Sequence, residues 1–301
     1  MVNPPLVSVV IPTYNRAENV QRAVKSALGQ TEKSVEVIVV DDGSSDDTME
    51  YVAALAATEP RVRFASNAHR SGPGGARNQG IELATGAFVA FLDSDDQWLP
   101  AKLEEQVSYF AEHPSAMALG TDCFLGGTAD VDRLARRYDR IDGDRDVVFE
   151  TIVRHKQFWI YTPTVMLRRE VFDRVGLFNE SLIRCEDLVM WLGINEQWRW
   201  HYLPRPLAII NLSIERNEAY DEKRHVPEGY YHMLFIRDIG QHVPVTEGRR
   251  AWLRRERRRP DYLYWVGRDK IQRGNPIGWL FYAGAIASKG WHRVAGEGRR
   301  R

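Results

Sequence analysis

The stretch GAFVAFLDSDDQW, residues 86–98, decides the fold, because an apolar run as long as one strand ends abruptly in acidic residues. Residues 88–92 predict one buried strand. Asp93, Asp95 and Asp96 follow, and alternation along an extended chain would put Asp93 and Asp95 on one face. Two such carboxylates repel each other unless a cation compensates them, and oxygen ligands suit Mg²⁺ or Mn²⁺. The stretch predicts a metal site; alternatively, these acids form a turn and cap the following helix.

Three more apolar runs, at 7–11, 35–40 and 62–65, precede this strand and predict strands of their own. Helical patterns lie between and after the four strands, at residues 17–29, 47–57, 76–84 and 99–112. Alternating strands and helices predict an α/β fold: a Rossmann-like, doubly wound, mainly parallel sheet flanked by helices.

Polar clusters follow three of the predicted strands. They are Pro12-Thr13-Tyr14-Asn15 after the first, Asp41-Asp42-Gly43-Ser44 after the second, and the acids Asp93, Asp95 and Asp96 after the fourth. Ligands of doubly wound sheets bind outside the carboxyl ends of the strands. We therefore expect these clusters to face one binding crevice.

The glycine-rich stretch SGPGGARNQG, residues 71–80, precedes the helix that leads into the fourth strand. Its four glycines, Gly75 among them, predict a backbone that closely approaches a ligand, and the helix start offers free N–H groups to an anion. Arg77 falls in the expected first turn, where a cation opposes the helix dipole, so a phosphate partner explains it better. Neither a dinucleotide fingerprint nor a P-loop is present.

In the second half, Glu186 and Asp187 stand directly before an almost wholly apolar helix. Either acid could simply cap that helix. A carboxylate at a helix N-terminus stays ionised but is a weaker base. Residues 123–158 mix both charges and predict an exposed insertion, while the histidines lack metal-ligand spacing.

The chain has 301 residues and 44% hydrophobic composition, enough for a full α/β core. Only Cys123 and Cys185 are present, which excludes a disulfide framework and indicates a reducing, cytoplasmic compartment. The first residues lack the pattern of a secretory signal. The longest candidate membrane segment, 276–287, is far shorter than the roughly 20 residues that span a bilayer.

A net charge of zero hides an asymmetry. Residues 249–301 hold 15 Lys and Arg against 4 Asp and Glu. Interleaved aromatic residues in this stretch indicate helices at an anionic membrane surface; alternatively, the rings pack on the catalytic domain. No recognition motif accompanies the charge, so nucleic-acid binding is not expected. We expect a catalytic domain at 1–215 and a helical, basic region at 216–301.

Five segments in this order resemble inverting family 2 glycosyltransferases of the GT-A fold, over roughly residues 6–210. They are VSVVIPTYNRAENVQRAVKSAL, VEVIVVDDGSSDDT, GPGGARNQG, FVAFLDSDDQW and CEDLVMWL. The resemblance implies transfer of a sugar from a nucleoside diphosphate donor, usually a UDP-sugar, to a hydroxyl of a saccharide or lipid-linked acceptor. Inversion at the anomeric carbon and help from Mn²⁺ or Mg²⁺ are implied too, in the setting of surface-polysaccharide or glycolipid assembly.

The resemblance also implies roles for individual residues. Asp187 corresponds to the catalytic base, with Glu186 beside it shaping the acceptor site; Asp95 corresponds to the metal ligand, with Asp93 close to ribose and metal. Arg77 corresponds to the basic residue near base and diphosphate, and Asp42 to the carboxylate that bonds the base. The nucleotide-sugar site as a whole comprises Pro12, Thr13, Tyr14, Asn15, Asp42, Gly75, Arg77, Asp93 and Ser94.

One departure concerns the segment after the last core strand. Many members carry a Tyr-Arg-x-His-like segment there, whereas residues 207–213 read LAIINLS. Asn211, Ser213 or Arg216 are candidates to replace the histidine, or a loop at 214–226 closes over the donor.

Three rival readings remain: a non-catalytic nucleotide-sugar binder, a sugar nucleotidylyltransferase, and a phosphoryl-transfer domain. PTYNR replaces the glycine-rich opening that a nucleotidylyltransferase needs, and a phosphoryl-transfer domain places its acids differently. The sugar, the acceptor and the oligomeric state stay open.

Overall fold

The computed structural model describes residues 6–67, 72–126, 160–180, 182 and 186–211, together with isolated positions between 254 and 283. The chain divides into two compact units, residues 1–222 and 223–301, and the α/β fold belongs to the first. The predicted helical region from residue 216 and the predicted insertion at 123–158 fall mostly outside the described residues. Described positions of the second unit include the helical residues Arg254, Trp279 and Leu280.

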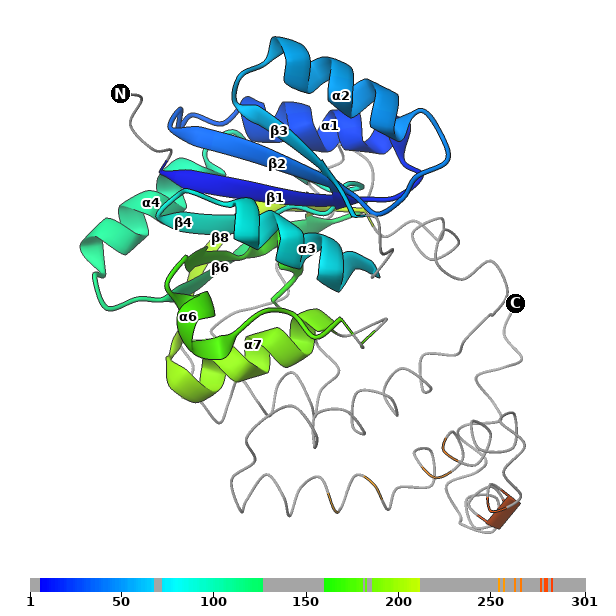
Figure 1. Cartoon of the computed structure of the whole chain (residues 1–301). Coiled ribbons are helices and arrows are strands. Elements are labelled where there is room, and N and C mark those ends of the chain that lie inside the picture. Colours follow the sequence, from blue (N-terminus) through cyan, green and yellow to red (C-terminus); the bar gives the residue numbers. More distant parts are fainter. Residues whose placement is uncertain are drawn as a thin grey trace. The chain divides into compact units, whose positions relative to one another are not determined.

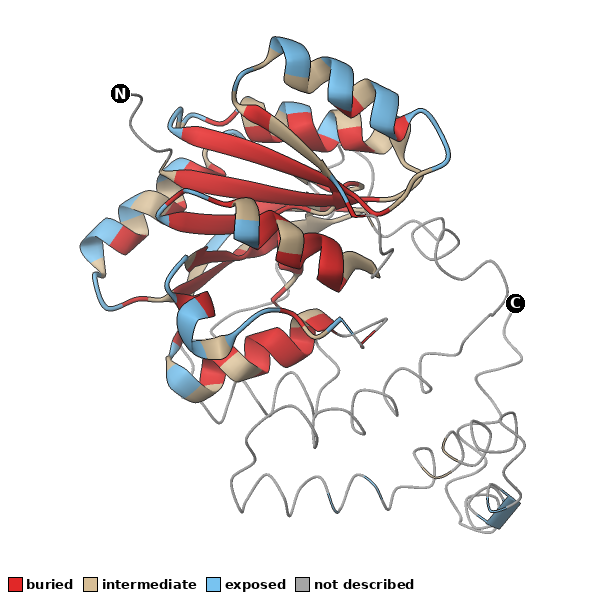
Figure 2. Cartoon of the chain, viewed as in Figure 1, coloured by how far each residue is buried: buried red, intermediate tan, exposed pale blue. Residues whose placement is uncertain are grey.

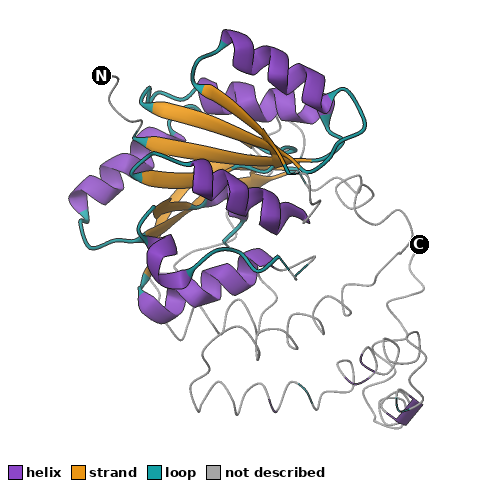
Figure 3. Cartoon of the chain, in the orientation of Figure 1, coloured by secondary structure: helices purple, strands orange, loops and turns teal. Residues whose placement is uncertain are grey.

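Strands and helices alternate along the first unit, as the apolar pattern predicts (Figures 1 and 3). The strands are β1 (Val7–Thr13), β2 (Val35–Asp41), β3 (Val62–Ser66), β4 (Phe88–Phe91), β5 (Gln97–Trp98), β6 (Ala118–Leu125), β7 (Met166–Arg168) and β8 (Trp200–Ile210). The helices are α1 (Ala17–Leu28), α2 (Thr48–Thr58), α3 (Gly72–Leu83), α4 (Lys102–Glu112), η2 (Thr162–Thr164), α6 (Val171–Val175) and α7 (Glu186–Gln197).

One sheet collects all eight of these strands in the order β3-β2-β1-β4-β7-β6-β8-β5. β3, β2, β1 and β4 run parallel to one another, and β7 is antiparallel to β4. β6 and β8 run parallel to each other. β1 lies between β2 and β4, with Val9 opposite both Val37 and Ala90. The polar residues after β1, β2 and β4 therefore leave the same edge of the sheet.

Helices cover both faces of the parallel part, which makes the sheet doubly wound (Figure 1). Val9 and Ile11 of β1 pack in one core cluster with Val20 and Val24 of α1. Val10 points the other way, toward α3, where a Cβ added at Gly80 would lie 2.3 Å from Val10 Cγ1. Gly80 thus permits the close approach of α3 to β1. Figure 2 shows that the central strands are buried almost throughout.

Aromatic packing attaches α7 to the sheet. The ring of Trp191, fully buried in α7, lies 6.0 Å from that of Phe91 in β4 and 5.9 Å from that of Phe178. Phe91 and Phe178 meet edge to face at 5.6 Å. Such contacts add to the large apolar area that each ring buries. They fix the start of α7 opposite the end of β4.

Two local predictions are wrong. The stretch 71–80 is not a loop before a helix: α3 begins at Gly72, which has φ 77°, and Arg77 lies inside the helix rather than in its first turn. After β4 the chain turns instead of staying extended, and Asp96 N–H donates to the Asp93 carbonyl at 3.0 Å. Asp93 and Asp96 therefore form a turn, as the alternative interpretation of this stretch predicts. They do not cap α4, whose N-cap residue is Ala101.

Candidate active site

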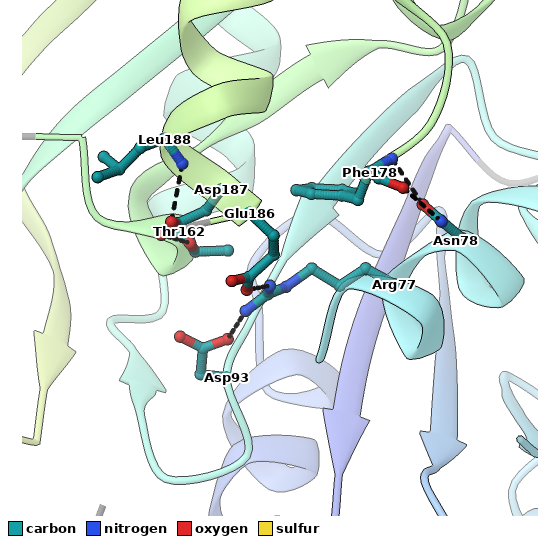
Figure 4. Close-up of polar contacts among 8 residues, drawn as sticks. All are labelled: Arg77, Asn78, Asp93, Thr162, Phe178, Glu186, Asp187 and Leu188. Atoms are coloured by element: carbon teal, nitrogen blue, oxygen red, sulfur yellow. Dashed lines mark hydrogen bonds and ion pairs between the residues drawn. The ribbon is translucent and has the colours of Figure 1, made fainter. Parts of the chain in front are cut away.

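Arg77 is the centre of a buried charge cluster where the ends of α3, β4 and α7 meet (Figure 4). Its Nη1 lies 2.6 Å from Glu186 Oε1, and its Nη2 lies 2.8 Å from Asp93 Oδ1. Arg77 and Glu186 are almost fully buried, whereas Asp93 is partly exposed. Arg77 thus joins the first residue of α7 to the first acid after β4. It contacts carboxylates directly, and its contact with a donor phosphate stays a prediction.

Asp187 lies beside Glu186 and points to the opposite side, toward η2 (Figure 4). Its Oδ2 accepts a hydrogen bond from Thr162 Oγ1 at 3.0 Å, and its Oδ1 accepts one from Leu188 N–H at 2.8 Å. The bond to Leu188 resembles helix capping, while the bond to Thr162 fixes the carboxylate against a separate segment. A capping function and a catalytic function are therefore compatible in this residue.

Burial raises the pKa of both acids at the start of α7. The pKa of Glu186 rises to about 7 because burial and the neighbouring Asp187 charge outweigh the stabilising charge of Arg77. The pKa of Asp187 also rises, first through burial, although Arg77 and its two hydrogen bonds oppose the change. The helix terminus alone would act in the other direction. Asp187 is therefore a stronger base than its position in the helix predicts.

Asn78, next to Arg77, fixes the loop that leads to α7. Its side chain accepts from Phe178 N–H at 2.8 Å and donates to the Phe178 carbonyl and to Glu180 Oε1, each at 2.9 Å. The guanidinium of Arg77 lies 5.6 Å from the centre of the Phe178 ring. The Arg77-Asn78 pair of α3 thus holds both the loop at 178–180 and the start of α7.

Asp42 bonds the chain's own donors at the end of β2. Its Oδ1 accepts from Asn67 Nδ2 at 2.7 Å and its Oδ2 from Gly72 N–H at 3.0 Å. Only 2% of Asp42 is exposed. The carboxylate therefore shapes the start of α3, and pairing with a nucleobase remains a prediction.

The predicted nucleoside-binding segment follows β1. Asn15 adopts φ 49°, and its Oδ1 accepts from Ser45 N–H at 2.7 Å, which ties the loops after β1 and β2 together. Thr13 is 3% exposed, and its Oγ1 has no hydrogen-bond partner among the described residues. A buried hydroxyl without a partner at this edge is a candidate ligand contact. Pro12, Tyr14, Gly75 and Ser94 lie at the same strand ends or inside α3.

The remaining acids of the turn after β4 have separate partners. Asp95 Oδ2 lies 2.8 Å from Arg16 Nη1, and Asp96 Oδ1 accepts from Asn211 N–H at 2.7 Å. Asn211 follows β8, in the segment that lacks the expected histidine, so this segment does meet the acidic turn. Ser213, Arg216 and the loop at 214–226 lie outside the described residues.

Asp93 and Asp95 fit a divalent cation by donor chemistry, since both present carboxylate oxygens at a strand end. In the described part of the chain, no group of three or more His, Cys, Asp or Glu side chains is placed to hold a metal ion. Each of the two acids instead bonds an arginine. The described ligand set is therefore two carboxylates, both already bound to cationic side chains.

Sequence reasoning missed four residues of this site: Arg16, Asn78, Thr162 and Phe178. Arg16 and Asn78 stand within the motifs PTYNR and GPGGARNQG, but only the fold shows which acids or loops they contact. Thr162 and Phe178 lie in segments without a motif. His201 Nδ1, by contrast, lies 2.9 Å from Tyr109 Oη.

The sequence profile of glycosyl transferase family 2 matches residues 8–176, more than half of the chain. The chain therefore belongs to this family. One relative, the Escherichia coli UDP-Glc:alpha-D-GlcNAc-diphosphoundecaprenol beta-1,3-glucosyltransferase WfgD, is 30% identical over 63% of the chain and 69% of its own length. Another, the putative teichuronic acid biosynthesis glycosyltransferase TuaG of Bacillus subtilis, is 32% identical over 63% of this chain and 72% of its own length. The chain spans only part of some other relatives, for example 36% of an uncharacterized glycosyltransferase of Rickettsia conorii and 27% of the chondroitin synthase of Escherichia coli.

Solved structures show the same fold. S. aureus TarS 1-349 in complex with UDP-GlcNAc has a TM-score of 0.64 at 20% identity, covering 93% of this chain and 88% of the TarS 1-349 chain. The mannosyltransferase PcManGT from Pyrobaculum calidifontis, in complex with GDP-Man and Mn2+, has a TM-score of 0.60 at 20% identity. The match covers 98% of this chain and 80% of the PcManGT chain. The predicted GT-A fold is thereby confirmed.

Proposed function

We propose that this protein is an inverting glycosyltransferase that moves a sugar from a UDP-sugar to an acceptor hydroxyl, with Asp187 as the base. The proposal rests on one observation: two sets of carboxylates, from separate segments of the chain, lie at the same site. Asp93 and Asp95 follow β4, where a donor would bind, and Asp187 stands at the start of α7, bonded to Thr162. The UDP-Glc in the name of WfgD and the UDP-GlcNAc bound to TarS support the choice of nucleotide.

Inversion by direct displacement needs a base on the face of the sugar opposite the departing diphosphate. Asp187 comes from a different segment than the donor-side acids, and burial raises its pKa. A stronger base accepts the proton of the acceptor hydroxyl more readily. Thr162 and Leu188 N–H orient the carboxylate, and Arg77 holds the neighbouring Glu186 at its side.

A divalent cation, Mn²⁺ or Mg²⁺, would be held by Asp95 and Asp93 and would stabilise the charge of the departing diphosphate. PcManGT was solved in complex with Mn2+, which supports a divalent cation in this fold. Thr13, Asn15 and Asp42 would line the nucleoside side of the donor site, together with Pro12 and Tyr14.

The acceptor is proposed to be a saccharide or a lipid-linked sugar, which the diphosphoundecaprenol in the name of WfgD supports. The region 249–301 would hold the enzyme at the inner face of the cell membrane. Ile277, Trp279 and Leu280 are 53%, 59% and 74% exposed there, as residues that enter an interface would be. Among the described residues, no helix is both long and apolar enough to cross a bilayer.

The test begins with thermal unfolding in the presence of UDP-, GDP- and dTDP-sugars, each with Mn²⁺. A donor that binds the native state raises the unfolding temperature by mass action. We expect UDP-sugars to give the largest rise. The best donor is then incubated with acceptor candidates, and the anomeric configuration of the product is read by NMR. Retention of configuration, or cleavage of the donor into a sugar phosphate, contradicts the proposal.

A non-catalytic nucleotide-sugar binder is the second candidate. It would give the same rise in unfolding temperature but no turnover with any acceptor. Slow hydrolysis of the donor in the absence of acceptor, lost in Asp187→Asn, separates the two candidates without knowledge of the acceptor.

A further inference from the structure

The short helix η2 carries the one side chain outside α7 that bonds Asp187 among the described hydrogen bonds. Thr162 Oγ1 donates to Asp187 Oδ2 at 3.0 Å (Figure 4). All three residues of η2 are buried. A single turn of three residues has little stability of its own, because the first turn of a helix is the costly one to form. The position of Thr162 therefore depends on what holds η2.

Two buried side chains hold η2 by its main-chain carbonyls. Trp98 Nε1 donates to the Pro163 carbonyl at 2.8 Å, and Gln106 Nε2 donates to the Thr164 carbonyl at 3.0 Å. Trp98 lies in β5 and Gln106 in α4, whereas Asp187 belongs to α7. Loss of either bond would leave a buried carbonyl without its donor, which costs more than the bond itself contributes.

Lys102 sets the direction of the Gln106 amide. Lys102 Nζ donates to Gln106 Oε1 at 2.7 Å, and it lies 4.1 Å from the centre of the Trp98 ring. An amide oxygen can only accept, so this bond turns the Nε2 end of Gln106 toward the Thr164 carbonyl. Lys102 is fully buried, and burial lowers the pKa of its amine. A neutral amine still donates, so the bond to Gln106 does not require the charge.

From these contacts we propose that Trp98, Gln106 and Lys102 are positioning residues, which hold η2 so that Thr162 orients the carboxylate of Asp187. The inference rests on the role of Asp187 as the base proposed above. The described side-chain bonds of Trp98 and Gln106 go to main-chain carbonyls, two of them in η2, and not to Asp187. Their effect on the base therefore passes through Thr162.

The pKa of Asp187 reports this positioning. The bond from Thr162 lowers that pKa, because it stabilises the ionised carboxylate. If η2 moves, the bond weakens and the pKa of Asp187 rises further. The charged groups that also act on Asp187, namely Arg77, Asp93 and the adjacent Glu186, stay in place when η2 loses its support. A general loss of stability would not change this pKa in the folded protein.

The test uses Trp98→Phe in the full chain, which keeps an aromatic ring in the core and removes the N–H that bonds Pro163. The matched control is Trp200→Phe. Trp200 is also buried, and its Nε1 donates to the Trp191 carbonyl, in the interior of α7, at 3.1 Å. Carboxyl-carbon NMR of protein labelled with ¹³C-aspartate follows the titration, and the Asp187 signal is assigned by its loss in Asp187→Asn. We expect the apparent pKa of Asp187 to rise in Trp98→Phe and to stay at the wild-type value in Trp200→Phe.

The transfer rate gives a second readout. Because a small misplacement of a reacting group is costly, kcat should fall at least about tenfold in Trp98→Phe, while the KM for the donor stays close to the wild-type value. Thr162→Val should act in the same direction on both readouts. If Trp98 acts through Thr162, then Trp98→Phe introduced into Thr162→Val should change neither readout further.

A second variant supports η2 from the other side less well without an unpaired amine in the core. Lys102→Met combined with Gln106→Leu replaces both polar partners by apolar side chains of similar size, which a fold tolerates better than the loss of one partner. It removes the donor to the Thr164 carbonyl. The pKa of Asp187 should rise in this variant as well.

A wild-type pKa of Asp187 in both Trp98→Phe and the Lys102→Met, Gln106→Leu protein overturns the inference. An equal rise in Trp200→Phe overturns it too, as does a further rise when Trp98→Phe is added to Thr162→Val. The NMR titration needs no turnover, so it separates this inference from the proposed function. A pKa that rises as expected without any change in transfer contradicts Asp187 as the base, and supports its orientation by η2.

Discussion

The two arginines that bind the acids after β4 are held in very different ways. Arg77 projects from the interior of α3, is nearly fully buried and spans Asp93 and Glu186. Arg16 projects from the start of α1, is 14% exposed, and its Nη1 lies 2.8 Å from Asp95 Oδ2. The first contact joins two halves of the fold, whereas the second lies at the edge of the proposed donor site.

The two arginines should therefore differ in how much each contributes to the stability of the fold. A buried arginine with two carboxylate partners is costly to remove, because Glu186 is left as an uncompensated buried charge. The Arg16–Asp95 pair is also largely buried, with side chains 14% and 7% exposed, but removal of Arg16 takes a cation from one of the described acids rather than from two. Stability should therefore depend more strongly on Arg77 than on Arg16.

The largest expected effect tests this contrast directly. Arg77→Gln should lower the free energy of unfolding by about 3–5 kcal/mol, the usual cost of breaking a buried pair. Arg16→Gln should lower it by less than Arg77→Gln does, because one described acid rather than two loses its arginine. Urea denaturation at pH 7 measures both. Arg77→Lys, which keeps the charge without the forked geometry, should fall between wild type and Arg77→Gln.

If Arg77→Gln and Arg16→Gln lower the free energy of unfolding equally, the two arginines do not differ in their contribution to stability. A stable Arg77→Gln protein would show that Glu186 and Asp93 need no buried counter-ion, and Arg77 would then be free to serve as a ligand contact.

A smaller effect is expected for the neighbour of Arg77. Asn78→Ala leaves the N–H and carbonyl of Phe178 without their partner, which should cost about 1–3 kcal/mol. Gln79→Ala, at a less buried position of the same helix, should cost clearly less and serves as the control. Unfolding midpoints of the two variants settle the comparison. If the two losses are alike, Asn78 does not hold the loop before α7.

The pH dependence of transfer sharpens the comparison at the acids themselves. The pKa of Glu186 is raised to about 7, and Glu186 titrates together with the adjacent Asp187. The wild-type rate should therefore fall as the pH drops through about 7. Glu186→Gln removes the group whose pKa is raised to about 7, so the acid limb of the rate profile should move to lower pH.

The rate profiles of both proteins between about pH 5 and 8 check this point. Gln can still accept a hydrogen bond from Arg77, so the fold should survive. A profile that does not move would show that Glu186 leaves the basicity of Asp187 unaltered.

The sequence predicts the parts of this molecule that depend on local pattern. Val-rich runs bounded by polar clusters predict β1 to β4 closely, and the acids at 93 and 187 stand out because charge directly adjoins an apolar run. The sequence does not show which partners these acids choose. Arg77 reaches Glu186 across more than 100 positions, and Thr162 meets Asp187 only because η2 and α7 pack near one another.

The glycine-rich stretch teaches a related lesson. Four glycines in ten residues predict a loop by propensity, yet α3 starts at Gly72 because the sheet and Glu186 lie close against it. An added Cβ at Gly74 would lie 3.3 Å from Glu186 Cγ. Close packing, which no local pattern reveals, accounts for Gly74 and Gly80, whereas Gly72 adopts φ 77° with open space beside it.

The most direct test of the central claim is the rate of sugar transfer by Asp187→Asn, measured beside its affinity for the donor. Asparagine has the same size; its Oδ1 can accept from Leu188 N–H and its Nδ2 can donate to Thr162 Oγ1, but it cannot accept the proton. We predict donor affinity close to wild type and a transfer rate lower by at least about 10²-fold. A wild-type rate, or a loss of donor binding that matches the loss of rate, would contradict the assignment of Asp187 as the base.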